Sequence, residues 1–350
     1  MKKGDRLLFR QSEEAAANSS FRRLDFWKSS LSPLPLGIVA TALLALVTAG
    51  CISISLFPQA MPLREKTVQG TAADKILMMD ISGVISDKGS SNPLSESEDL
   101  VARIKEELTL AAEDSHIRAL LLRINSPGGT VTASDVIHHE ISEFKTKRKI
   151  PVVATIMDIG ASGGYYIAVA ADQIIAHPTS VTGSVGVIML RVNAEGLLQK
   201  IGVEAGAIKS GAKKDIGSPF RPMSEEERAI FQGMINGFQS RFLEVVTKGR
   251  KALPADQLKL IADGRVLTGP QAVQLGLVDQ VGYLDDGIAA AKQLAGLADA
   301  RVVMYVRPGT YKNNIYSQAP GTSTLEALAN LDIMGLVRGG TPQFLYLWIP

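Results

Sequence analysis

The stretch at residues 157–187, MDIGASGGYYIAVAADQIIAHPTSVTGSVGV, is the part of this chain that decides its fold. It begins at the end of an apolar strand expected at residues 152–157, passes through a turn of small residues and enters a helix near Ser162. A second short strand is expected at residues 173–176. A hydroxyl at a helix start lies beside free N–H groups, where developing negative charge is stabilised. Ser162 is therefore a candidate nucleophile.

Apolar strands alternate with helices on both sides of this stretch. Strands that are apolar throughout and alternate with helices predict an α/β fold with a parallel sheet and crossover helices. Further strands are expected at residues 75–83, 117–124, 203–208 and 301–306, with a turn at residues 125–129, and helices at residues 99–112, 134–145, 194–201 and 286–295.

A long helix is predicted to begin with a capping box at Ser224 and Glu227. Its apolar face carries Ile230, Met234, Ile235, Phe238 and Phe242. The apolar stretch at residues 344–349 is expected to form an edge strand or to dock on a neighbouring subunit.

The composition excludes several classes of protein. The chain has 350 residues, 46% of them hydrophobic, which is enough for a membrane anchor and a large domain. A net charge of +2 does not favour nucleic acid as a partner. The single cysteine, Cys51, rules out an intramolecular disulfide. The four histidines are not spaced as a ligand set, so we expect no metal and no cofactor.

The N-terminal region predicts a membrane anchor. No charged residue stands between Lys28 and Arg64, and the run is longer than the ~20 apolar residues that span a bilayer. Basic residues are denser before the run than after it, which places the N-terminus in the cytoplasm and the rest of the protein on the exported side. A cleaved signal peptide and a lipid attached to Cys51 are the alternatives. The expected divisions are a cytoplasmic segment at 1–32, the transmembrane anchor at 33–57, a linker at 58–74, the main domain at 75–310 and a C-terminal tail at 311–350.

The base that would activate Ser162 has several candidates. Residues 160–164 match G-x-S-x-G, the nucleophile elbow of α/β-hydrolases, which needs an acid and then a histidine downstream. His177 is the only downstream histidine and no long acid-bearing segment precedes it, so we expect His177 to be structural. A neutral lysine serves as the base in Ser-Lys enzymes. The candidates lie in one Gly- and Ser-containing loop, for which a solvated basic loop is the alternative: Lys209, Lys213 and Lys214.

Five short motifs follow one another along the exported part of the chain. They are NSPGG at 125–129, ASGGYY at 161–166, TGSVGV at 182–187, KSGAKKD at 209–215 and TGPQAVQLGLVD at 268–279. Their order resembles that of the signal peptide peptidase A family, membrane-anchored bacterial serine peptidases with a ClpP/crotonase-like fold. The resemblance covers residues 75–295. Because ASGGYY occurs once, the chain resembles the short, single-repeat form.

The resemblance implies a role for each matching residue. It makes Ser162 the nucleophile and Lys214 the general base, with Ser184 orienting the lysine and Gly129 contributing to the oxyanion hole. The N–H of Gly163, directly after the nucleophile, is our own structural candidate for the second oxyanion donor. The implied substrates are signal peptide remnants and other unfolded peptides.

The resemblance also implies a homo-oligomeric ring at the bacterial plasma membrane. In longer, duplicated members of the family the serine and the lysine lie on different repeats. We therefore expect Ser162 and Lys214 to meet across a subunit boundary. The alternatives from other classes are a crotonase-like acyl-binding protein, for which CoA is lacking outside the cell, and a non-catalytic membrane scaffold.

Overall fold

The structure is a computed structural model that describes residues 61–87, 91–92, 95–96, 99–308, 312–317 and 343–349. The chain divides into two compact units, Met1–Ala60 and Met61–Pro350, and all described residues belong to the second. The predicted cytoplasmic segment, the predicted membrane anchor and Cys51 therefore lie outside the described residues. Among the helices that are described, none is both long enough and apolar enough to cross a bilayer.

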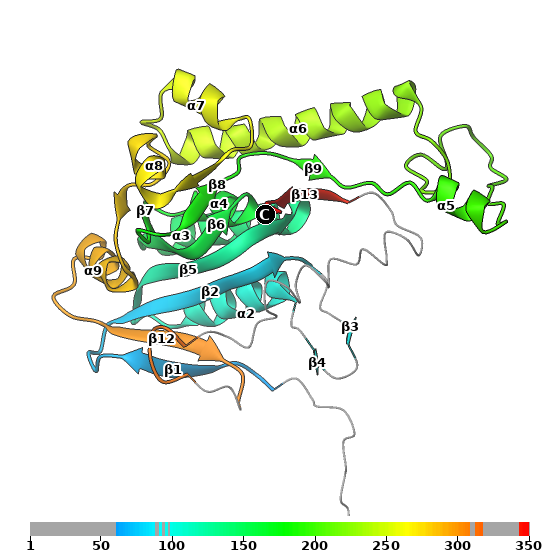
Figure 1. The fold of residues 1–350 in the computed structure, drawn as a ribbon. Helices are drawn as coiled ribbons and strands as arrows, with labels where there is room; N and C mark the ends of the chain where they lie inside the picture. Colours follow the sequence, from blue (N-terminus) through cyan, green and yellow to red (C-terminus); the bar gives the residue numbers. More distant parts are fainter. Residues whose placement is uncertain are drawn as a thin grey trace, which may run out of the picture. The chain divides into compact units, whose positions relative to one another are not determined.

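A largely parallel sheet forms the centre of the domain (Figure 1). Along its main path every neighbouring pair is parallel except β1 with β12. In spatial order the strands are β1 (Arg64–Gln69), β12 (Arg301–Val306), β2 (Lys75–Ile85), β5 (Ile117–Thr130), β6 (Val152–Ala161), β7 (Gln173–Ala176) and β11 (Gln280–Val281). The predicted mixed α/β fold with a parallel-rich sheet is confirmed.

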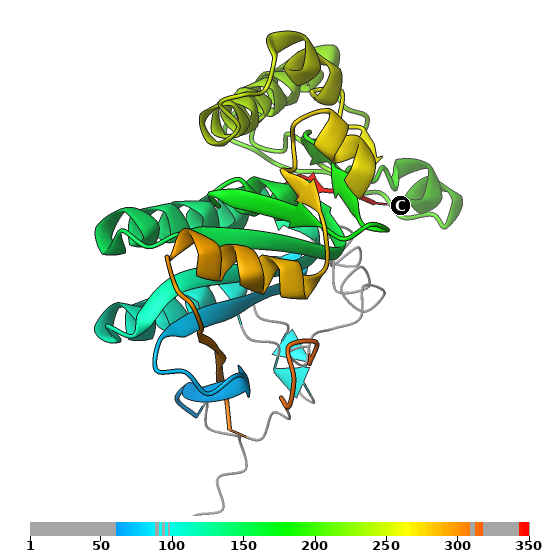
Figure 2. The same cartoon turned by 90° about the vertical axis from the view of Figure 1, so that its left-hand side faces the viewer.

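The central strands are apolar along most of their length because helices cover both faces of the sheet (Figure 2). Successive side chains of a strand point to opposite faces. In β5, Leu120 and Leu122 accordingly enter one apolar cluster, whereas Leu121 enters the other. The first cluster includes residues of α2 (Leu100–Glu113), α3 (Val131–Arg148), α4 (Gly163–Ala168) and α6 (Glu225–Gly249), and the second includes residues of α9 (Leu284–Leu294).

Shorter strands extend the sheet beside the turn that joins β6 to α4. Strand β8 (Val181–Gly183) is parallel to β6 and antiparallel to β10 (Val266–Thr268). Strand β13 (Phe344–Leu347) is antiparallel to β5 on one side and to β9 (Ile188–Met189) on the other. The C-terminal apolar stretch is thus a strand of this chain's own sheet. It is paired on both sides, so the expectation of an edge strand is wrong.

The remaining described elements lie outside the main sheet. They are the strand pair β3 (Ser91–Asn92) and β4 (Ser95–Glu96), and the helices α5 (Glu195–Lys200), α7 (Ala255–Ile261) and α8 (Gly269–Gln274).

Three segments differ from the sequence prediction. Residues 125–129 do not form a turn but continue β5, with a register shift against β6 between Ile124 and Ser126. Part of the expected linker forms β1, because its backbone groups pair with β12. Residues 203–208 form neither helix nor strand, since no neighbouring strand pairs with them and Val203 and Ile208 are exposed.

Helix α6 begins with the predicted capping box. The N–H of Glu227 donates to Ser224 Oγ at 3.2 Å, and the N–H of Ser224 donates to Glu227 Oε2 at 3.0 Å. Phe242 is buried, but Ile230 and Met234 are each 42% exposed, so this chain covers only part of the predicted apolar face. Residues 190–223, which we call the arm, carry α5 and extend to the N-terminal end of α6 (Figure 1).

The turn between β6 and α4 holds Ser162 in a strained backbone conformation. Its φ is 52° and its ψ is −115°, in a region of backbone conformation that residues other than glycine rarely occupy. The Ser162 N–H donates to the carbonyl of Gly183 at 2.8 Å, which ties the turn to the end of β8. Strain of this kind costs about 1–3 kcal/mol and persists where the surroundings enforce it.

We expect Ser162→Gly to be more stable than Ser162→Ala by about 1 kcal/mol. Glycine adopts a positive φ without steric cost, and this relief exceeds the roughly 0.5–1 kcal/mol that its greater unfolded-state entropy costs. Denaturant unfolding of both full-length variants measures the difference. Both variants lack the hydroxyl, so the comparison isolates the backbone. Equal stabilities would show that the turn stores no strain.

Candidate active site

The hydroxyl of Ser162 is buried and has no hydrogen-bond partner in the part of the chain that the structure describes. The residue is 1% exposed, and no described group makes a hydrogen bond with its Oγ, which does not cap α4 either. An unsatisfied buried polar group costs about 1–3 kcal/mol, so its presence in a native fold calls for a reason such as catalysis. The hydroxyl lies at the first turn of α4, as predicted.

Glycines let two backbone segments meet beside Ser162. Gly128 has a φ of 103°, and a Cβ on it would lie 2.7 Å from the backbone nitrogen of Gly163. The N–H of Gly128 itself donates to Ser126 Oγ at 3.1 Å. A Cβ on Gly129 would lie 1.8 Å from the carbonyl oxygen of Ile85. No larger residue fits at either position, and the structure brings Gly128, the residue before Gly129, against Gly163 at the start of α4.

Ser184 lies next to the residue that holds the Ser162 backbone. It directly follows Gly183, has a φ of 52°, and is 7% exposed. Its N–H donates to the carbonyl of Arg265 at 2.7 Å, which fixes this backbone from the β10 side. Four of the predicted site residues therefore lie around the β6–α4 turn: Ser162, Ser184, Gly129 and Gly163.

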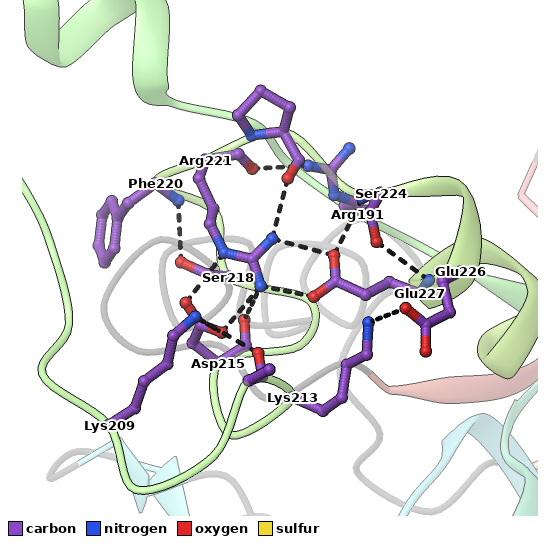
Figure 3. Close-up of polar contacts among 12 residues, drawn as sticks. Arg191, Lys209, Lys213, Asp215, Ser218, Phe220, Arg221, Ser224, Glu226 and Glu227 are labelled. Atoms are coloured by element: carbon purple, nitrogen blue, oxygen red, sulfur yellow. Dashed lines mark hydrogen bonds and ion pairs between the residues drawn. The ribbon is translucent and has the colours of Figure 1, made fainter.

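Lys214 is not part of this group within one chain. It lies on the arm, its side chain is exposed, and no described residue forms a hydrogen bond or ion pair with its ammonium. The other two candidate lysines are held by carboxylates: Lys209 Nζ lies 2.5 Å from Asp215 Oδ1, and Lys213 Nζ lies 2.6 Å from Glu226 Oε2 (Figure 3). Of the three, only Lys214 is unengaged by the described residues.

Arg221 clamps the loop that carries these lysines, a role that sequence reasoning missed. Its guanidinium donates from Nε to Asp215 Oδ2 at 2.9 Å and from Nη1 to Glu227 Oε2 at 2.9 Å (Figure 3). Further bonds from Nη2 reach Asp215 Oδ1 at 2.8 Å and Glu227 Oε1 at 2.5 Å. The loop is thereby fixed to the capped start of α6. The only signal in the sequence is an arginine that stands six residues from each of two acids.

The ion pairs of the clamp shift the pKa of both carboxyls. Hydrogen bonds from Arg221 and then Lys209 hold the pKa of Asp215 far below its ordinary value. The Arg221 guanidinium, together with the N–H of Ser224, lowers the pKa of Glu227 to about 2. Both groups are therefore ionised at neutral and mildly acidic pH, and the clamp persists over that range.

His177 takes no part in the site. Its Nδ1 lies 2.9 Å from Thr179 Oγ1, and its ring meets the edge of Tyr283 at a centroid distance of 4.9 Å. Since no described group reaches Ser162 Oγ, a Ser-His pair is excluded in this arrangement.

Two protein families match the chain over this region. Peptidase family S49 matches residues 144–298, which include Ser162, Ser184 and Lys214. The Clp protease family matches residues 90–182, which include Gly129 and Ser162.

Several curated proteins are similar to the chain over most of the described domain. A protein of Enterococcus faecium with the provisional name signal peptide peptidase SppA is 39% identical over 241 residues, 69% of this chain and 70% of that protein. A provisionally named protease of Synechocystis sp. is 44% identical over 190 residues, 54% of this chain and 68% of that protein. Protease 4 of Haemophilus influenzae is 36% identical over 221 residues, 63% of this chain but 35% of that protein. The chain therefore belongs to peptidase family S49 and is a serine peptidase.

Proposed function

We propose that this protein is a membrane-anchored endopeptidase that hydrolyses peptides with a Ser-Lys dyad, Ser162 as nucleophile and Lys214 as base. The observation that carries the proposal is the buried hydroxyl of Ser162 at the start of α4, to which no described residue bonds. The name of the Enterococcus faecium relative points to signal peptides as its substrates. We extend that substrate class to this chain, together with other unfolded peptides.

The proposed reaction uses only groups of the protein and water. Ser162 Oγ attacks the peptide carbonyl while neutral Lys214 accepts its proton, and the N–H groups of Gly129 and Gly163 bind the oxyanion. Lys214 then protonates the leaving amine, and the acyl group remains on Ser162 as an ester. Water activated by the same lysine hydrolyses the ester and frees the enzyme. Ser184 accepts or donates a hydrogen bond that orients the amine.

A neighbouring copy of the chain supplies the lysine in this proposal. Ser162 Oγ has no partner among the described residues of its own chain, and Lys214 is exposed on the arm. The arm lies at the N-terminal end of α6 (Figure 1). Large apolar side chains are exposed on the same arm and on α6, and burial against another subunit would stabilise them. They are Leu197, Ile201, Ile208, Ile230 and Met234.

The proposed location follows from the predicted anchor. With residues 33–57 in the bilayer and the N-terminus in the cytoplasm, the described domain lies on the exported side of the plasma membrane. Remnants of cleaved signal peptides are apolar and lie in the same membrane.

A serine-reactive phosphonate separates this function from an acyl-binding protein or a scaffold, because only a peptidase is labelled at Ser162.

We expect Lys214→Ala to lose peptidase activity by about a hundredfold or more, since a general base contributes about that much to the rate. Lys213→Ala is the matched control and should keep most of the activity, because Lys213 pairs with Glu226. Hydrolysis of an apolar fluorogenic peptide by full-length proteins in detergent measures both, with Ser162→Ala as the inactive reference. The wild-type rate should rise with pH, because a base accepts a proton only when it is neutral. Full turnover by Lys214→Ala would remove this lysine from the mechanism.

Mixed oligomers test whether the dyad forms between subunits. When Ser162→Ala and Lys214→Ala chains are combined and reassembled, a pair with an intact serine on one chain and an intact lysine on the next regains activity. Each variant alone should stay inactive. The measurement is peptidase activity beside native mass spectrometry that confirms mixing. Confirmed mixing without any regained activity contradicts a dyad shared between chains.

We expect Arg221→Ala to lower kcat by about tenfold or more with little change in KM, because the clamp positions the loop that carries Lys214. Arg228→Ala is the control, since Arg228 makes only a surface pair with Glu225 at 3.6 Å. Arg221→Lys should restore little of the kcat, because a lysine ammonium cannot make the paired hydrogen bonds to Asp215 and Glu227 that the guanidinium makes. The pH profile of peptidase activity should have the same shape in Arg221→Ala as in the wild type. The ionised Glu227 stabilises the clamp until the pH falls toward the pKa of this carboxyl in the folded protein, which is about 2. A normal kcat in Arg221→Ala would show that the clamp has no role in positioning.

A further inference from the structure

Strand β5 contains a bulge just before the glycines of the site. Against β2, Ser82 pairs with Asn125 and Val84 pairs with Gly128, so two steps along β2 (82 to 84) oppose three along β5 (125 to 128). We call residues 125–128 the bulge. An extra residue of this kind bends the strand and changes the direction of the backbone that follows it.

Two adjacent polar side chains bridge the bulge to the neighbouring strands. The hydroxyl of Ser126 donates to the carbonyl of Gly83 on β2 at 2.6 Å and accepts from the N–H of Gly128 at 3.1 Å. On the opposite side, Asn125 Oδ1 accepts from the N–H of Ile159 on β6 at 3.1 Å. These side chains therefore join β5 to both neighbours where the register of the sheet changes.

Ser126 is also enclosed by the start of α4. The residue is fully buried, and a Cβ on Gly164 would lie 2.7 Å from the carbonyl oxygen of Ser126 and 3.5 Å from its Cβ. The hydroxyl has a partner both as a donor and as an acceptor, so its burial leaves it satisfied. Ser126 thus contacts β2, its own strand and the helix of the nucleophile.

The Ser126 hydroxyl holds the backbone that leads to a proposed oxyanion donor. Gly128 has a φ of 103° and lies against the backbone nitrogen of Gly163. Because glycine has access to many backbone conformations, the bond to its N–H helps to select this one. Gly129 follows directly. A group that stabilises a transition state has to be held within about 0.5 Å of its productive position.

We propose that Ser126 is a positioning residue for peptide hydrolysis. Its hydroxyl fixes Gly128, and through Gly128 it places the N–H of Gly129 for the oxyanion. The inference rests on the proposed function, in which Gly129 and Gly163 bind that oxyanion. Ser126 is fully buried, so removal of its hydroxyl leaves the surface that meets a peptide unchanged. The loss is therefore confined to the transition state.

Steady-state hydrolysis of the fluorogenic peptide by full-length Ser126→Ala in detergent tests the inference. We expect kcat to fall about tenfold to a hundredfold while KM changes by less than about twofold, because the oxyanion exists only in the transition state. Ser126→Thr retains the hydroxyl and should keep more of the kcat than Ser126→Ala does.

Ser180→Ala is the matched control. Ser180 is also fully buried, and its hydroxyl donates to the carbonyl of His177 at 2.9 Å, a bond that lies outside the bulge. This variant loses a buried hydroxyl of the same kind and should keep its kcat. Denaturant unfolding of both variants shows whether their stabilities are comparable.

A peptide aldehyde distinguishes the oxyanion hole from ordinary peptide binding. Ser162 Oγ forms a bond to the aldehyde carbon of Leu-Leu-leucinal, the C=O double bond becomes single, and the serine proton passes to the former carbonyl oxygen. That oxygen then lies at the place of the oxyanion. Leu-Leu-leucinol cannot form this adduct. We expect Ser126→Ala to weaken inhibition by the aldehyde by the same factor as kcat/KM, and inhibition by the alcohol by less than about twofold.

A wild-type kcat in folded Ser126→Ala overturns the inference and leaves the peptidase, as do equal losses of inhibition by the aldehyde and the alcohol. If circular dichroism shows that Ser126→Ala does not fold, Ser126→Cys takes its place, because a thiol fills the site but is only a weak donor. It has to show a fall in kcat without a matching change in KM. Wild-type protein that neither cleaves a peptide nor is inhibited by the aldehyde contradicts the proposed function, and the inference is then overturned with it.

Discussion

The hydrogen bond from the Ser162 N–H to the carbonyl of Gly183 is the interaction on which the site depends. It ties the end of β6 to the end of β8, so the chain turns sharply into α4 and leaves Ser162 at a positive φ. In that conformation the hydroxyl does not cap its own helix. The first N–H groups of α4 therefore stay available for an anionic oxygen. The same pairing places Ser184 beside the turn that carries Ser162.

The rigidity of this turn comes from the sheet beneath it. Strands β5 and β6 are buried on both faces, so their ends cannot shift without opening one of two apolar clusters. The glycines at 128, 129 and 163 add a second constraint, since the backbones that meet there leave no room for a Cβ. A strained residue persists only where its surroundings determine its conformation in this way. The backbone of Ser162 is thus held from several sides at once.

The proposed base belongs to a different kind of structure. The arm carries Lys214 on a loop that is held by the ionic clamp of Arg221 and by few apolar contacts. Near neutral pH, a lysine is neutral and able to accept a proton only when burial or fixed hydrogen bonds lower its pKa. A solvent-exposed arm does not provide that shielding, whereas contact with a second copy would. Because Ser162 lies at the end of the sheet and Lys214 lies on the arm, assembly of subunits is a part of the proposed mechanism.

The sequence by itself determined the elements whose signals are local. The apolar strands, the small residues around Ser162 and the capping box at Ser224 each depend on neighbours within a few positions, so the alternating α/β pattern and the helix start at the serine could be predicted. The expectation of a turn at residues 125–129 is wrong because Pro and Gly indicate a turn locally, whereas pairing with β2 keeps these residues in strand β5. The tertiary structure alone decided what joins distant segments. The hydroxyl of Tyr346 bonds to Phe238 across 108 positions of sequence, and β13 enters the sheet between β5 and β9. No periodic pattern records such a contact, because the choice of partner is fixed only when the whole sheet and its helices have packed.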